Sequence, residues 1–84
     1  MNKDIEIVSN KYKVYIPDLT NFHFVKLLIA SNKSFDTTHT LKLYDFDGDY
    51  VFFDFDFDEL NICLEYYEKI KNILKNNLNN EKSI

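Results

Sequence analysis

The spacing of apolar residues changes once along this chain of 84 residues, and that change limits the folds open to it. As far as Phe55, apolar and polar residues alternate in short runs, with the period of two that is typical of β-strands. From Leu60 onward the apolar residues recur at steps of three or four, the period of an amphipathic helix. The sequence therefore predicts strands followed by one helix, which is an α+β arrangement.

The first two strands are expected at residues 4–8 and 12–16, joined by a two-residue turn. This register pairs Ile5 with Ile16 and Ile7 with Val14, so that four aliphatic side chains share one face, and it pairs Ser9 with Tyr12. A register that sorts polar and apolar residues onto separate faces is good evidence for a hairpin. Residues 22–30 fit either a strand or a helix, and their aromatic and β-branched content favours the strand.

A second hairpin is expected at residues 39–46 and 50–55, around the turn sequence Asp47-Gly48-Asp49. A loop of three or five residues keeps both faces consistent, because it pairs apolar residues with apolar ones. The pairs on the inner face are then Leu43 with Phe53 and Leu41 with Phe55. On the opposite face, Lys42 pairs with Asp54 and Tyr44 with Phe52.

A helix is expected at about residues 57–78, followed by a frayed tail at 79–84. Asp56 is a suitable N-cap, and Glu59 three residues later completes a capping box. The apolar stripe of this helix would pack on the sheet. We therefore expect a single domain over residues 1–84: an antiparallel β-meander of four or five strands with one C-terminal helix packed across one face.

One helix covers only one face of such a sheet, so the second hairpin would present its other face to solvent unless the N-terminal hairpin folds over it. On that other face, the second hairpin carries four aromatic residues, namely Tyr44, Phe46, Tyr50 and Phe52. Exposed aromatic patches of this kind are typical of contact surfaces. We expect a partner or a second copy of the chain to bind this surface.

The charge is concentrated in the same part of the chain. Residues 45–68 hold nine acidic residues and no basic one, although the net charge of the whole chain is only -4. Six of the nine are the closely spaced aspartates Asp45, Asp47, Asp49, Asp54, Asp56 and Asp58. A concentrated negative field steers a basic partner toward a surface and discriminates against other partners. The sequence therefore predicts a basic protein as the partner.

The sequence lacks the residues that most catalytic mechanisms need. The single cysteine, Cys63, lies on the apolar stripe, and no Cys/His cluster has zinc spacing. One glycine excludes a glycine-rich phosphate loop. The acids from Asp45 to Asp56 have partial calcium-loop spacing, but Gly48 is not at the position that such a loop requires. We expect a protein that is not an enzyme and has no metal and no cofactor.

The absence of arginine and the acidic segment argue against direct nucleic-acid binding, because that segment would repel phosphates. No apolar run is long enough to span a membrane. The first residues lack the apolar stretch of a secretory signal, so we expect a cytoplasmic protein.

These expectations together favour a small acidic inhibitor that occupies the basic site of a nucleic-acid-binding or nuclease protein. Phage-encoded inhibitors of host defence nucleases, such as anti-CRISPR proteins, are of this kind and act in the host cytoplasm. The six aspartates would attract the partner and the four aromatic residues would anchor it. Two alternatives stay open: an immunity protein or antitoxin that neutralises a nuclease toxin, and a homo-oligomeric structural or adaptor module.

Overall fold

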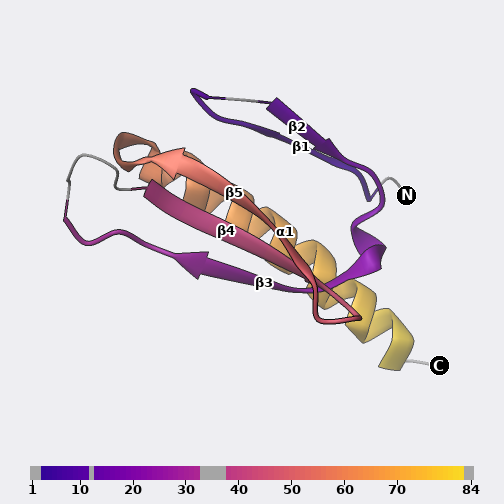
Figure 1. Ribbon diagram of the computed structural model, residues 1–84. Coiled ribbons are helices and arrows are strands. Elements are labelled where there is room, and N and C mark those ends of the chain that lie inside the picture. Colours follow the sequence, from indigo (N-terminus) through magenta and orange to yellow (C-terminus); the bar gives the residue numbers. More distant parts are fainter. Residues whose placement is uncertain (1–2, 12, 33–37, 83–84) are drawn as a thin grey trace.

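The computed structural model describes residues 3–11, 13–32 and 38–82, with the backbone alone over 77–82 (Figure 1). The α+β class is confirmed: these residues form two antiparallel sheets and one long C-terminal helix. The strands are β1 (Ile5–Val8), β2 (Lys13–Ile16), β3 (Phe22–Leu28), β4 (Thr38–Asp45) and β5 (Tyr50–Asp56), and the helix is α1 (Leu60–Lys82).

The expectation of a single meander is wrong, because β2 does not pair with β3. Strands β1 and β2 form one sheet, and β3, β4 and β5 form another in that order. Between the sheets the chain passes through Asp18, whose φ is 55°, and a 3-10 turn at Leu19–Asn21. Leu19 is fully buried, and its N–H donates to the carbonyl of Lys3 over 2.9 Å. The connection is therefore anchored in the core, where it redirects the chain away from β2.

The register of the first hairpin is confirmed. Ile5 lies opposite Ile16 and Ile7 opposite Val14, and all but the half-buried Val14 are buried. The expected pair of Ser9 with Tyr12 lies outside the described residues. Residues 22–28 are a strand, as expected, but the strand ends at Leu28, two residues before the expected end, and Ile29 beyond it is 53% exposed.

The second hairpin has the expected faces but a different register. Leu41 lies opposite Phe53 and Tyr44 opposite Tyr50, a displacement of two residues from the expected pairs. The cause is the turn, which is centred on Asp47 and not on Gly48. The Oδ1 atom of Asp45 accepts hydrogen bonds from the N–H groups of Asp47 (2.9 Å) and Asp49 (3.0 Å).

Gly48 completes this turn. Its φ of 91° lies in the left-handed region, which a three-residue hairpin loop requires at its last position and which glycine adopts without steric cost. The loop therefore has an odd length, as expected. Odd length preserves the two faces, and the position of the turn fixes which residues are opposite each other.

The helical segment starts where the sequence indicated but ends later. A 3-10 turn at Phe57–Glu59 leads into α1, and Asp56 and Glu59 form the predicted capping box. The helix continues to Lys82, beyond the expected end at 78. Neither glycine nor proline occurs between 57 and 82, so no residue type that stops a helix intervenes.

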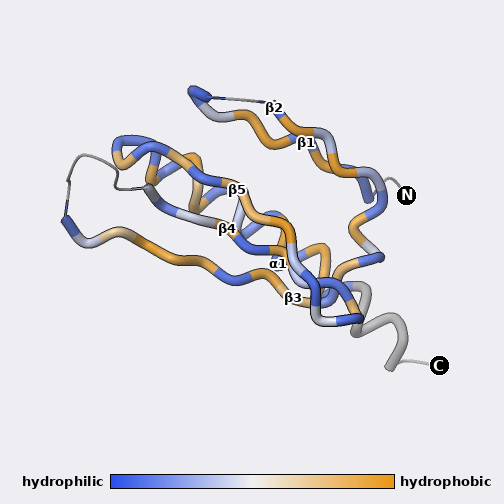
Figure 2. The backbone as a smooth tube through the Cα atoms, viewed as in Figure 1, coloured by the Kyte–Doolittle hydropathy of each residue, from blue (hydrophilic) through white to orange (hydrophobic). Residues whose placement is uncertain are grey.

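The core lies between α1 and one face of the three-stranded sheet, and the β1–β2 hairpin closes it from the side (Figure 1). Apolar stretches of both sheets, orange in Figure 2, supply most of its side chains. The largest fully buried ones include Phe55, Ile7, Leu41, Leu43 and Ile70. Because the hairpin packs on the helix side, no described element covers the opposite face of the three-stranded sheet.

Candidate protein-binding face

We call the uncovered side of the three-stranded sheet the outer face. Alternation along the strands sorts the side chains: Phe53 is 5% exposed on the core side, whereas its neighbour Phe52 is 58% exposed. Phe24 and Tyr50 are about half exposed. The outer face consists of Phe24, Lys26, Leu28, Thr40, Lys42, Tyr44, Tyr50, Phe52 and Asp54.

Aromatic side chains form a continuous row across the three strands at one end of this face. The ring centroids of Phe24 and Tyr44 are 5.8 Å apart, and those of Tyr44 and Tyr50 are 5.3 Å apart. Both separations are in the range of favourable aromatic pairs. Each strand contributes one residue, so the row is a product of the sheet register.

Lysine side chains occupy the centre of the outer face. The next cross-strand row contains Lys26, Lys42 and Phe52. The Nζ atom of Lys42 lies 4.6 Å from the centroid of the Tyr50 ring, a cation–π contact that holds the ammonium against the aromatic row. The centre of the face is therefore aromatic and cationic, and not acidic.

The structure brings three of the four predicted aromatic residues, Tyr44, Tyr50 and Phe52, onto the outer face. Phe46 instead lies in the turn beside it, where it is 65% exposed and its ring centroid is 5.3 Å from that of His23. Sequence reasoning missed Phe24, which joins the aromatic row from β3. An available signal was its spacing of two residues from Lys26, which places both side chains on the polar face of the strand.

The six predicted aspartates are separated into two groups. Asp45, Asp47 and Asp49 lie at the turn between β4 and β5, whereas Asp54, Asp56 and Asp58 lie at the other end of β5 and beyond it. At about 3.3 Å per residue of strand, the groups are about 20 Å apart. The aromatic and lysine rows lie between them.

Contacts within the chain hold Asp45, Asp54 and Asp56. Asp45 holds the turn, and Asp54 accepts a hydrogen bond from the hydroxyl of Thr40 over 2.7 Å. Asp56 belongs to the capping box and forms a 3.2 Å ion pair with Lys11 of the first hairpin. Asp47, Asp49 and Asp58 are exposed to solvent. Fewer carboxylates are therefore available to a partner than the sequence indicated, because Asp45, Asp54 and Asp56 are engaged within the chain.

The groups that could carry other chemistry have structural roles. Cys63 is fully buried, and burial, aided by the nearby Glu59 carboxylate, raises the pKa of its thiol to about 11. His39 is 1% exposed: its Nδ1 accepts from the N–H of Ala30 over 3.1 Å, so its Nε2 donates to the carbonyl of Phe57 over 2.8 Å. Among the described residues, no three His, Cys, Asp or Glu side chains are placed to hold a metal ion.

Comparison with known proteins finds no match among family models, curated sequences or solved structures. Within the described part of the chain, no helix has the length and apolar character needed to cross a membrane.

Proposed function

We propose that this protein acts by binding another protein through the outer face and thereby inhibits it. The observation that carries the proposal is the row of Phe24, Tyr44 and Tyr50 with Phe52 beside it, on a sheet face that no described element covers. Large aromatic side chains left exposed together are typical of interaction sites and supply much of the binding energy of protein interfaces.

The arrangement of charges supports a basic partner. Carboxylates lie at both ends of the outer face, so the aromatic and lysine rows lie between acidic margins, and charged margins are common in protein interfaces. Charged margins mainly accelerate association and select the partner. The class of protein we propose is a nucleic-acid-binding or nuclease protein, whose basic site would meet the two acidic groups.

The lysines of the outer face refine this proposal. Lys26 and Lys42 would be repelled by a uniformly basic surface, so the partner must present apolar or acidic groups to the middle of the face. We therefore propose a partner whose basic residues flank an apolar patch. The proposal differs from imitation of a nucleic-acid backbone, because such imitation would need negative charge across the whole face.

Charge reversal at the turn tests the proposal. We expect the double variant Asp47→Lys/Asp49→Lys to retain its fold, because both residues are exposed, and to lose partner binding at low salt. The matched control is Glu65→Lys/Glu68→Lys, which makes the same change of charge on exposed positions of α1. The measurement is affinity capture from a lysate of the source organism at low and high salt, quantified by mass spectrometry.

The proposal predicts that a nucleic-acid-binding or nuclease protein is retained by the unmodified protein and by the control, but not by the turn variant. Equal retention by the turn variant would exclude electrostatic attraction at the turn. Recovery of this chain alone, together with a dimer on a sizing column, would instead assign the outer face to self-association.

A further inference from the structure

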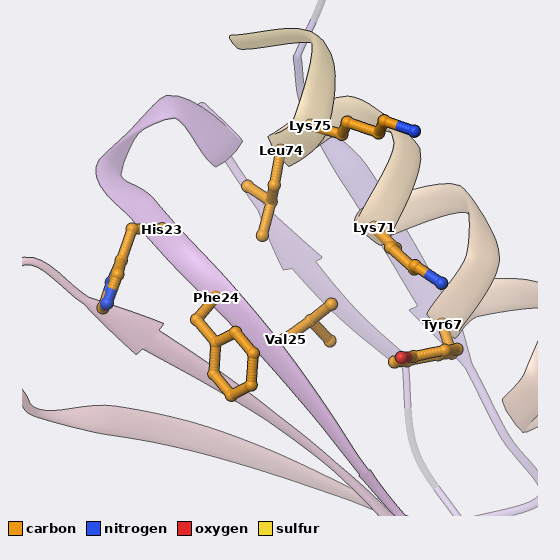
Figure 3. A pocket seen from close by; sticks show the side chains of 7 residues that line it. All are labelled: His23, Phe24, Val25, Tyr67, Lys71, Leu74 and Lys75. Carbon is orange, nitrogen blue, oxygen red and sulfur yellow. The ribbon is translucent and has the colours of Figure 1, made fainter. Parts of the chain in front are cut away.

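A hollow lies on the helix side of β3, between this strand and α1 (Figure 3). Its volume is about 280 Å³. A cavity of about 150 Å³ is enough to hold a benzene ring, so this one can accept a large apolar side chain. The lining residues are His23, Phe24, Val25, Tyr67, Lys71, Leu74 and Lys75.

The hollow has an apolar floor and a cationic rim. Val25 and Leu74 are 6% and 4% exposed and form the floor. Tyr67 forms one wall, with the Nζ atom of Lys71 5.5 Å from the centroid of its ring. Lys71 and Lys75 are exposed, and the lining contains no carboxylate. An apolar group that carries negative charge beside it would complement both features of the hollow.

The backbone of β3 adds a third element to this site. β3 is an edge strand that pairs only with β4 among the described strands. In an antiparallel edge strand, every second residue directs its N–H and C=O away from the sheet, where an added strand can pair with them. The register with β4 shifts between Phe22 and Phe24, so regular pairing on β3 begins at Phe24, beside the hollow.

We propose that an extended acidic peptide segment of a partner protein binds here, as a fourth strand added to the free edge of β3. One apolar side chain of the peptide would enter the hollow, and its carboxylates would face Lys71 and Lys75. Main-chain pairing supplies affinity in this mode of recognition, and pockets for alternate side chains supply specificity. The site shares Phe24 with the outer face, but its apolar floor and both lysines lie on the helix side of β3, and its test does not require the function proposed for the outer face.

A synthetic probe tests the proposal directly. The probe is the fluorescent heptapeptide Val-Glu-Val-Phe-Val-Glu-Val, in which both glutamates lie on the same side of the extended strand as the central phenylalanine, so that all three can face the helix side of β3. Its binding is measured by fluorescence polarisation. We expect the analogue with lysine in place of glutamate to bind at least tenfold more weakly. Only one of the two alternating sets of peptide amides would face β3, so N-methylation of that set should abolish binding and N-methylation of the other should not.

Protein variants locate the site. We expect Lys71→Glu/Lys75→Glu to weaken binding about tenfold and Lys71→Gln/Lys75→Gln to weaken it less, whereas the control Lys13→Glu/Lys69→Glu changes it by less than twofold. Circular dichroism checks that each variant folds. In the unmodified protein, the peptide should shift the NMR amide signals of residues 24–28.

Three results would overturn this proposal. One is equal affinity for the acidic and basic peptides, and another is tolerance of N-methylation in both sets. The third is concentration-dependent association of the protein alone that shifts the same amide signals, which would assign the edge of β3 to a second copy of the chain. None of these three results would change the expected loss of partner capture by the turn variant Asp47→Lys/Asp49→Lys. The two proposals can therefore fail separately.

Discussion

At the scale of single residues, Glu59 connects two parts of the molecule that are distant in the sequence. Its side chain accepts a hydrogen bond from the N–H of Asp56 at the start of the helical segment (3.0 Å) and another from the N–H of Asn10 in the first hairpin (2.9 Å). The residue is only 5% exposed. The capping role was predictable because it depends on a spacing of three residues. The contact with Asn10, 49 residues away, has no local signal.

Removal of this carboxylate should destabilise the protein. We expect Glu59→Ala to lower the free energy of unfolding by about 1–3 kcal/mol, because two backbone N–H groups lose their acceptor. Glu59→Gln should cost less, since one oxygen remains as an acceptor. Urea denaturation measures both, with Glu65→Ala on the exposed side of α1 as the control. Equal stability of Glu59→Ala and the control would contradict this role.

Cys63 should be chemically inert while the protein is folded. With a pKa of about 11, roughly one thiol in a thousand is ionised at pH 8, and the side chain is fully buried. We expect a thiol-specific disulfide reagent to modify Cys63 quickly in denaturant and only very slowly without it. Rapid modification of the native protein would show that the thiol is accessible and would reopen a nucleophilic role.

At the scale of secondary-structure elements, the two faces of β5 should respond differently to the same substitution. Phe53→Ala leaves a cavity in the core and should cost about 3–5 kcal/mol of stability. Phe52→Ala, one residue away on the outer face, should change stability by no more than about 0.5 kcal/mol. Chemical denaturation of the two variants measures the difference. A large loss from Phe52→Ala would mean that the outer face is part of the core.

The same strand shows how far the sequence predicts an element. The faces of β4 and β5 follow from alternation, which any loop of odd length preserves. The exact pairing could not be predicted, because it depends on the Asp45 carboxylate binding two backbone N–H groups of the turn. The first hairpin was predicted with its correct register, because only one register separates its polar and apolar residues.

At the scale of the whole molecule, the sequence did not reveal where the first hairpin packs. Its position depends on contacts between distant residues, among them the burial of Leu19 and the 3.0 Å hydrogen bond from the N–H of Val8 to the hydroxyl of Tyr66. Those contacts place the hairpin on the helix side. As a result, the aromatic residues of the outer face stay exposed, while the aspartates, which are close together in the sequence, flank that face in two groups.

The outer face as a partner-binding surface is the central claim, and comparative affinity capture tests it most directly. The test variant is Tyr50→Ser/Phe52→Ser, and the control is Ile62→Ser, which removes an apolar side chain that is 40% exposed on α1. We predict that both variants keep the circular dichroism spectrum of the unmodified protein, and that a partner captured by the unmodified protein and the control is lost by the double variant. Capture of the same partner in equal amounts by all three proteins would contradict the claim.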